Sequence, residues 1–376
     1  MTWQLVETNA DLQALLVQAS ACEAVVIDTE FMRRNTFFPQ VALLQLAFDD
    51  GSEQQPHAWL VDPLSVDDID SIRELMANER LIKVLHSPSE DLEVFSRWLG
   101  VLPQPLFDTQ KAAALLNMGF GMGFRALALE MLGVDLPKGE TRSDWLQRPL
   151  STAQCEYAAL DVTCLQPVWR KLRDLAQAQG KYEWVMADGD DMIRAAQAPT
   201  VAYYLKIKGA WKLAPDQLQV LAALCEWREA TARLKDKPRG WILDDNACLQ
   251  LAQQLPTSQA QLSAVENVPP AVVRKHGDKL LDLITRAGDV NSPPTPALSP
   301  PLDAAGRSYL KKIKQSARAI AQEIEVAPEA ILPSKDYELL IREAMGQPVE
   351  TPAHWAGWRS ACVIAPLRNN AMELVS

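Results

Sequence analysis

The sequence lacks the patterns that mark several common classes of protein. None of its six cysteines forms a C-x-x-C pair, so zinc ribbons and dithiol redox motifs find no support. H-E-x-x-H and G-x-x-x-x-G-K-[ST] are both missing, which argues against a zinc metalloprotease and a P-loop nucleotidase. No apolar run approaches the roughly 20 residues that span a bilayer, and the first residues carry no basic region of a signal peptide. We therefore predict a cytoplasmic protein with reduced thiols and no membrane partner.

A net positive charge is missing as well. The 376 residues carry a formal charge of −11, whereas a protein that grips nucleic acid by its phosphates usually has a basic surface. The acidic balance argues against tight, extended, non-specific binding to nucleic acid. It does not argue against an enzyme that handles only a chain end, where metal ions supply much of the positive charge.

The first half of the chain predicts an α/β domain at residues 1–180. Short β-branched or apolar runs alternate there with helical patterns, which is typical of strands covered by helices. The expected strands are 24–27, 41–48, 58–61 and 82–85, and the expected helices are 66–76, 89–98 and 109–116. Because the first three strands follow one another closely, we expect antiparallel neighbours and a mixed sheet.

The rest of the chain predicts helices. Residues 181–211 are expected to connect the α/β domain to a helical domain at 212–289, in which apolar residues recur at helical spacing. Residues 290–301 predict a stiff, extended linker, because five prolines fall within the eleven residues 291–301. A second helical domain is expected at 302–370.

A pair of carboxylates follows the first expected strand. Asp28 and Glu30 are two residues apart, so their side chains lie on the same face of the strand. Two like charges at the end of a buried strand repel each other and are costly to desolvate. A divalent cation relieves both problems, and hard oxygen ligands favour Mg²⁺ or Mn²⁺. The D-x-E triplet occurs three times in the chain, however, and carboxylates that are merely solvated at a strand end are an alternative explanation.

Two further groups of candidate residues lie on expected helices. The spacing of Ser151 and Gln154 is that of a capping box, and Tyr157 and Asp161 share one face of the helix that begins there. Asp91 lies in the first turn of a helix that follows a strand and a Pro-containing turn. A packed ring with an exposed acid would also explain the first group. The preference of acids for helix N-termini would also explain Asp91.

The order of these pieces along the chain carries more information than each piece alone. V-I-D-T-E-F is followed by L-H-S-P-S-E-D-L-E-V-F, then by R-S-D-W-L-Q-R-P-L and Q-C-E-Y-A-A-L-D-V. This succession resembles the DEDDy exonucleases and, within them, the ribonuclease D family, over nearly the whole α/β region. Residues 238–284 resemble an HRDC domain, and the region after the linker resembles a more diverged second copy. The implied fold is an α/β RNase H-like exonuclease domain with a mixed sheet, followed by two small all-α HRDC-like helical bundles.

The resemblance implies a metal-dependent 3′→5′ exoribonuclease that releases nucleoside 5′-monophosphates with two divalent cations. The metal ligands that it implies are Asp28, Glu30, Asp91 and Asp161. Tyr157 would orient the attacking water. Lys138 would approach the scissile phosphate, and Phe31 would pack against the terminal nucleotide. An exposed loop lysine and a core phenylalanine are the alternatives for Lys138 and Phe31. His86, in contrast, is expected to be a buried, hydrogen-bonded residue, and Asp108 a structural one.

The implied partners are RNA 3′ ends, in tRNA precursors and other small structured RNAs. A 3′→5′ DNA exonuclease of the same superfamily is an alternative, because the same four acids serve both activities. A contact to the terminal 2′-OH would discriminate between them, and the sequence does not reveal one. A catalytically inactive nucleic-acid-binding scaffold is a third possibility. Its sign would be the loss of a metal-binding acid, and all four acids are present.

Basic residues gather in both helical domains. The second group consists of Lys311, Lys312, Lys314 and Arg318. Such clusters are either contacts for nucleic acid or solvated helix faces. If they are contacts, the helical domains would steer the substrate end towards the exonuclease domain.

Overall fold

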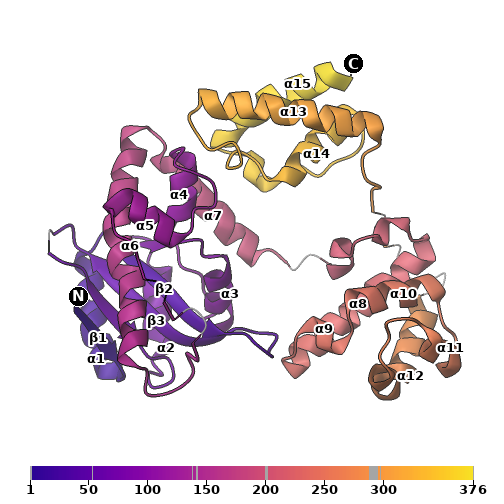
Figure 1. Cartoon of the computed structure of the whole chain (residues 1–376), viewed down its shortest axis with the longest axis horizontal. Coiled ribbons are helices and arrows are strands. Elements are labelled where there is room, and N and C mark those ends of the chain that lie inside the picture. The colour runs from indigo at the N-terminus through magenta and orange to yellow at the C-terminus, as the bar shows by residue number, and fades with distance from the viewer. Residues whose placement is uncertain are drawn as a thin grey trace. The chain divides into compact units, whose positions relative to one another are not determined.

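A computed structural model describes residues 2–52, 54–137, 139–140, 143–199, 202–287, 295–296 and 298–375 (Figure 1). The chain forms two compact units. The first unit holds Met1–Met32, Gln40–Gln197 and Leu302–Ser376, and the second holds Arg33–Pro39 and Ala198–Pro301. Among the described residues, no helix is both long enough and apolar enough to cross a membrane.

One mixed sheet forms the centre of the first unit. Its strands within the described residues are β1 (Thr2–Val6), β2 (Ala24–Met32), β3 (Gln40–Asp49), β4 (His57–Val61), β5 (Ile82–Leu85) and β6 (Leu106–Asp108), in the order β1-β4-β3-β2-β5-β6. β3 runs antiparallel to β2 and to β4, and the other neighbouring pairs are parallel. The predicted mixed sheet with three antiparallel neighbours at its centre is confirmed.

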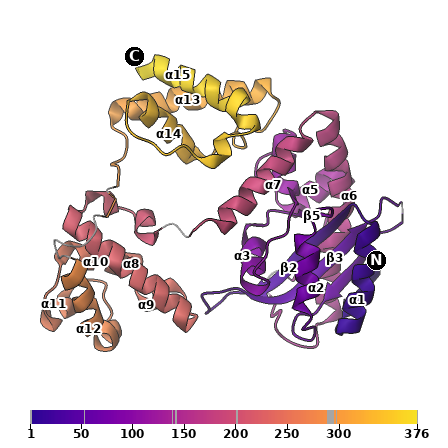
Figure 2. The same ribbon diagram turned by 180° about the vertical axis from the view of Figure 1, so that it is seen from behind.

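Helices cover both faces of this sheet, because its central strands are apolar on both sides. Ile27 and Leu44 pack on the side of α1 (Asn9–Leu16), α2 (Ile69–Ala77) and α3 (Ser89–Trp98). Val26 and Leu43 pack on the side of α4 (Thr109–Leu115), α5 (Phe124–Leu132) and α6 (Thr152–Ala178). Figure 1 is seen from the side of α6, and Figure 2 from the side of α1 and α2.

The start of α6 is set by the predicted capping box. The Ser151 hydroxyl accepts from the Gln154 N–H, and the Gln154 side-chain oxygen accepts from the Ser151 N–H at 3.0 Å. Both bonds satisfy N–H groups that a helix leaves without partners at its first turn. The helix then runs for 27 residues and packs against β2, β3 and β4.

The first unit extends beyond the expected boundary at residue 180. Helix α7 (Tyr182–Gln197) opens the expected connecting segment and packs against β6 and α4. The helices α13 (Ala304–Glu323), α14 (Ser334–Ala344) and α15 (Ala365–Val375) belong to the same unit. Asp188 on α7 forms a buried ion pair with Arg359, and the rings of Trp184 and Trp358 stack at 4.5 Å. An ion pair and an aromatic stack therefore fasten the C-terminal helices to α7.

The second unit is helical, with one addition from the N-terminal half of the chain. It contains α8 (Pro215–Lys235), α9 (Arg239–Ile242), α10 (Asp245–Gln254), α11 (Gln259–Ala264) and α12 (Pro270–Ala287). Phe37, from the segment between β2 and β3, is buried with the Arg233 and Arg239 guanidinium groups 4.8 and 4.5 Å from its ring. An Asp236 oxygen accepts from the Phe37 and Phe38 N–H groups at 2.9 and 3.0 Å. Much of the expected linker at 290–301 lies outside the described residues.

Candidate active site

Three of the predicted acids meet at one place. Asp28 and Glu30 lie two residues apart on β2, and Asp161 lies on α6, which crosses that strand. One carboxylate oxygen from each residue lies within 4.8 Å of the others. Strand alternation thus brings Asp28 and Glu30 to one face, as the sequence predicts, and α6 adds the third acid from the layer above.

Asp91 reaches the same cluster from a different element. It lies in the first turn of α3, as predicted, and accepts a hydrogen bond from the Thr29 hydroxyl on β2. The turn before α3 includes Ser87, whose φ of +56° is uncommon for a residue with a side chain. Its N–H donates to the buried Asp108 carboxylate at 2.9 Å. Asp108 therefore has the structural role that the sequence suggested, since it fixes the turn that leads to Asp91.

The pKa of each of the four carboxyl groups is raised. Burial is the largest cause in each case. It raises the pKa of Glu30 to about 9, of Asp161 to about 7 and of Asp91 to about 6, and the pKa of Asp28 also rises well above its usual value. For Asp28 and Glu30, the charges of Asp161 and Asp91 contribute part of this rise. Such a group of half-buried carboxylates fits hard divalent cations, because a positive charge offsets both the loss of hydration and the repulsion.

Tyr157 lies one helical turn before Asp161 and is hydrogen-bonded to its carboxylate. Burial, and then the charges of Asp161, Glu30 and Asp28, raise the pKa of the Tyr157 hydroxyl. The hydroxyl therefore keeps its proton at neutral pH and acts as a hydrogen-bond donor.

The ring of Tyr157 is held from two sides. The buried Trp145 ring lies 6.1 Å from it, between ring centres. On another side, a β-carbon placed on Gly139 would lie 1.9 Å from Cδ2 of the ring. This separation is far inside van der Waals contact, so only a glycine fits at position 139 with the ring in this place.

A β-bulge lies directly beside the acids. Glu30 pairs with Leu43 and Phe31 pairs with Val41, so Ala42 is an extra residue on β3. The Arg148 guanidinium donates to the Ala42 carbonyl at 2.6 Å, and also to the buried Asp62 carboxylate at 2.6 and 2.7 Å. Bulges beside active sites commonly redirect a side chain, and this one is fixed by Arg148.

The remaining predicted residues have varied positions. Phe31 is half-buried on β2, immediately after Glu30. Lys138 lies outside the described residues, so its predicted place near the phosphate stays a prediction. Both ring nitrogens of His86 are hydrogen-bonded, Nδ1 to the Thr109 hydroxyl at 2.9 Å and Nε2 to the Met122 carbonyl at 3.1 Å. His86 is therefore the structural histidine that we expected.

Sequence reasoning did not identify the roles of Thr29, Gly139 and Arg148. Thr29 stands between the two strand acids, and its position in D-T-E was a usable signal, since a hydroxyl beside carboxylates is a ready hydrogen-bond donor. Gly139 and Arg148 act through contacts with residues that are distant in the sequence. No local pattern distinguishes them from an ordinary loop glycine and an ordinary surface arginine.

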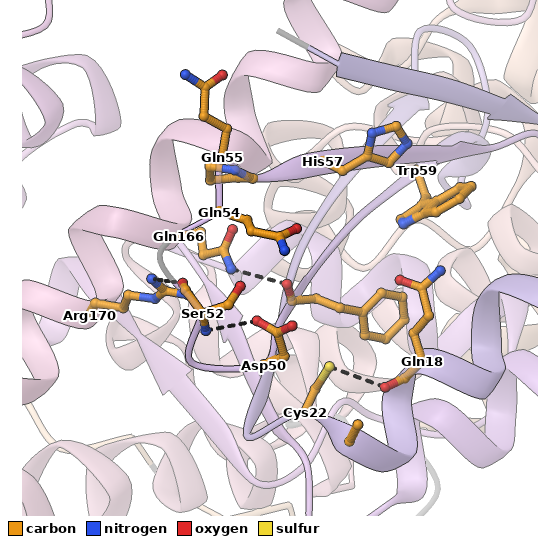
Figure 3. Close-up of a pocket in the computed structure, with 13 residues that line it drawn as sticks. Gln18, Cys22, Asp50, Ser52, Gln54, Gln55, His57, Trp59, Gln166 and Arg170 are labelled. Carbon is orange, nitrogen blue, oxygen red and sulfur yellow. Dashed lines mark hydrogen bonds between the residues drawn. The ribbon is translucent and has the colours of Figure 1, made fainter.

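A hollow of about 260 Å³ at the other edge of the sheet does not belong to this site (Figure 3). It lies where β2 begins and β3 ends, and two of its polar side chains bind neighbouring groups. Arg170 donates to the Asp49 carboxylate and the Ser52 carbonyl, and Gln166 donates to the Phe48 carbonyl. These contacts hold α6 to the β3–β4 connection, which is a structural task.

The sequence matches known protein families and individual relatives. A family described as 3′-5′ exonuclease matches residues 3–177, and the HRDC domain family matches residues 217–284. The chain is 41% identical over 339 residues to ribonuclease D of Pseudomonas paraeruginosa, covering 89% of this chain and 88% of that one. It is 32% identical over 385 residues to ribonuclease D of Escherichia coli, covering 99% of each.

A solved structure agrees over the same length. The crystal structure of Escherichia coli RNase D, described as an exoribonuclease involved in structured RNA processing, superposes with a TM-score of 0.89 at 31% identity. The superposition covers 99% of both chains. The expected RNase H-like exonuclease domain and HRDC domain, with a helical C-terminal region, are confirmed. The chain belongs to the ribonuclease D family and is a 3′→5′ exoribonuclease.

Proposed function

We propose that this enzyme trims the 3′ ends of small structured RNAs, tRNA precursors among them, at the cluster of Asp28, Glu30, Asp91 and Asp161. The observation that carries the proposal is the meeting of three half-buried carboxylates from β2 and α6. Each cycle would remove one nucleotide as a nucleoside 5′-monophosphate.

The four acids would hold two divalent cations, Mg²⁺ or Mn²⁺. When bound, such ions lower the pKa of an attacking water and offset charge on the scissile phosphate. Asp28 is the residue whose pKa responds to all three other acids, which suits a ligand shared by both ions. Glu30 and Asp161 would complete one ion site, and Asp91 the other.

Tyr157 would orient the attacking water by a hydrogen bond from its hydroxyl, whose proton would turn from the Asp161 carboxylate to the water oxygen when Asp161 holds a cation. The raised pKa of this hydroxyl favours a positioning role over that of a base. In the reaction the water oxygen bonds to phosphorus and the bond from phosphorus to the 3′ oxygen breaks. The water releases a proton to solvent, and the displaced 3′ oxygen takes one up. The products are a nucleoside 5′-monophosphate and an RNA that is one residue shorter.

Residues outside the four acids would contact the RNA substrate. Phe31 would pack against the terminal nucleotide from its place beside Glu30, and Lys138 would approach the scissile phosphate. Residues 302–370 would form a second HRDC-like bundle that contacts RNA together with the first.

The six cysteines are all free thiols, which fits a reducing compartment, and we assign the enzyme to the cytoplasm.

The test compares matched RNA and DNA oligonucleotides with 3′ overhangs, in Mg²⁺, in Mn²⁺ and in EDTA. We expect the RNA to be shortened stepwise. This shortening should require metal and should be lost in Asp28→Asn. Equal shortening of the DNA would move the assignment to a DNA exonuclease. Binding of RNA without shortening would mean an inactive scaffold, and unchanged activity of Asp28→Asn would refute the assigned site.

A further inference from the structure

A groove of about 330 Å³ lies in the first unit, away from the four carboxylates. One wall is Phe120, from the loop between α4 and α5. The other wall comes from the C-terminal helices, with Lys314 and Arg318 on α13 and Tyr337 on α14. We call this the basic groove. Its lining combines an aromatic face with two cationic side chains.

Phe120 is displayed to solvent by its loop. Its side chain is 54% exposed, although a phenylalanine normally gains free energy from burial. The flanking Gly119 and Gly121 have φ values of +144° and +66°, which other residues rarely adopt. The loop is also fixed, because the Met122 carbonyl accepts hydrogen bonds from the His86 ring and from Gln110 at 3.1 and 2.9 Å. The two glycines therefore allow the loop to turn so that the ring of Phe120 lies in solvent.

Helix α13 is basic in an acidic protein. It carries five basic residues and a single acid, Glu323, while the whole chain has a net charge of −11. Arg318 is exposed and Lys314 is half-buried, with its ammonium 5.9 Å from the Tyr337 ring. Within the part of the chain that the structure describes, neither forms an ion pair. Their positive charges are thus available to a ligand. Glu329, which also lines the groove, partly offsets these charges.

We propose that the basic groove is a binding site for the RNA substrate, at nucleotides on the 5′ side of the 3′ end that is hydrolysed. A base would stack on Phe120, and the neighbouring phosphates would lie against Lys314 and Arg318. Aromatic faces interleaved with basic side chains are the common means of holding a nucleic-acid strand without sequence preference. The inference rests on the proposed function, since it assumes that RNA is the substrate.

The groove is physically connected to the catalytic cluster. The loop that bears Phe120 is hydrogen-bonded to His86, which directly follows β5. The same connection leads, five residues later, to Asp91 on α3. Because β2 and β5 are parallel neighbours, the ends of both strands meet at one edge of the sheet. A strand of RNA bound at Phe120 would therefore lie on the edge that carries the acids.

The test measures RNA binding by fluorescence anisotropy in the Asp28→Asn background, with Mg²⁺ present. The probe is a 5′-labelled RNA hairpin with a single-stranded 3′ tail, and a gel checks that it stays intact. Arg318→Glu is compared with Arg80→Glu, which changes the net charge equally but lies before β5, at the opposite edge of the sheet. We expect Arg318→Glu to weaken binding about tenfold and to flatten its dependence on salt. Arg80→Glu should weaken binding less than about twofold.

Phe120 provides a second, uncharged test. Phe120→Ala should weaken binding about tenfold through lost stacking, and Phe120→Trp should retain it. Glu329→Gln should strengthen binding, because it removes the one acid in the groove. Arg318→Lys, which keeps the charge, controls for damage to the fold.

Two results would overturn the inference. One is equal weakening by Arg318→Glu and Arg80→Glu, which would reveal a general effect of net charge. The other is parental affinity in Phe120→Ala, which would leave the exposed ring to a protein partner. The proposed function is judged separately, by metal-dependent shortening of the same RNA with Asp28 intact. The groove variants should keep the parental kcat with a raised KM, whereas failure of the parent itself to shorten the RNA would count against the proposed function.

Discussion

Gly139 lies against the ring of Tyr157, so closely that a β-carbon on Gly139 would be 1.9 Å from Cδ2 and 2.3 Å from Cε2 of the ring. The two residues come from a loop and from α6, and they are 18 positions apart in the sequence. The glycine thus forms one wall of the space that holds the tyrosine. Any larger residue at position 139 must push the ring, and with it the hydroxyl that we propose orients the water.

We predict that Gly139→Ala lowers kcat about tenfold or more while KM for RNA changes little. The physical reason is a displaced Tyr157 hydroxyl, which costs a hydrogen bond made during hydrolysis. Gly240→Ala is the matched control, because Gly240 lies in a helix with no atom within 4 Å of an added β-carbon. In a Tyr157→Phe background, Gly139→Ala should cost little more. A full additional loss there would mean that Gly139 does not act through the tyrosine.

The stability of the metal-free enzyme should fall as the pH rises. Burial raises the pKa of Glu30 to about 9, of Asp161 to about 7 and of Asp91 to about 6 in the folded protein, while unfolded carboxyls have a pKa near 4. The folded state therefore holds protons that the unfolded state releases. The free energy of unfolding should decrease from about pH 4 to about pH 9. Urea denaturation in EDTA at several pH values measures this, and Mg²⁺ or Mn²⁺ should restore stability at the alkaline end.

Removing one carboxyl charge should separate activity from stability. Asp28→Asn should lower kcat by about 10³-fold, which corresponds to ~4 kcal/mol. In EDTA at pH 8 the same variant should be more stable than the parent, because an amide at position 28 needs neither a bound proton nor a charge that the other carboxyl groups repel. Thermal melting with and without Mg²⁺ gives the comparison, with the exposed Asp216→Asn as control. A variant that is less stable than the parent in EDTA would contradict the proposed repulsion.

The ion pair of Arg148 and Asp62 should contribute strongly to folding. Asp62 is 1% exposed, and Arg148→Ala would leave its charge buried without a partner. We expect a loss of about 3 kcal/mol in the free energy of unfolding, together with reduced activity as the bulge opposite Glu30 relaxes. Arg125→Ala is the contrast, because the Arg125–Asp135 pair is exposed and should cost less than about 1 kcal/mol. Similar losses in both variants, measured by urea denaturation, would argue against this role.

Phe37 should hold residues 33–39 within the second unit. Its side chain is 3% exposed, and Phe37→Ala should cost about 3 kcal/mol. The released segment should then be cut faster by trypsin, after Arg33 or Arg34. Phe38→Ala, at a half-buried position, should have a smaller effect. Unchanged cleavage in Phe37→Ala would show that Asp236 alone fixes the segment.

The acids could be predicted from the sequence because local periodicity determines where they point. Alternation on a strand brings Asp28 and Glu30 to one face, and a helical turn does the same for Tyr157 and Asp161. The capping box at Ser151 fixed the start of α6 and hence the position of both helix residues. The strands β1 and β6 were missed. β6 has three residues, too few for a periodic signal, and Thr2–Val6 is a short run interrupted by Gln4.

What the sequence could not provide are contacts between segments far apart along the chain. The packing of Gly139 on Tyr157 and the bond from Arg148 to the Ala42 carbonyl depend on tertiary structure alone. The same holds for α7, which reads as an ordinary amphipathic helix after the expected domain boundary. Its Asp188 can be buried there because Arg359, 171 residues later, pairs with it in the interior.

The position of residues 33–39 has a consequence for synthesis on the ribosome. These seven residues connect two central strands of the sheet, yet their partners Arg233, Asp236 and Arg239 are translated about 200 residues later. Folding during translation generally proceeds from the N-terminus, domain by domain. Here the hairpin that bears Asp28 and Glu30 must wait, with Phe37 exposed, until α8 and α9 have left the exit tunnel. A nascent chain interrupted before residue 239 would thus carry the strand with Asp28 and Glu30 while still exposing the apolar segment that follows it.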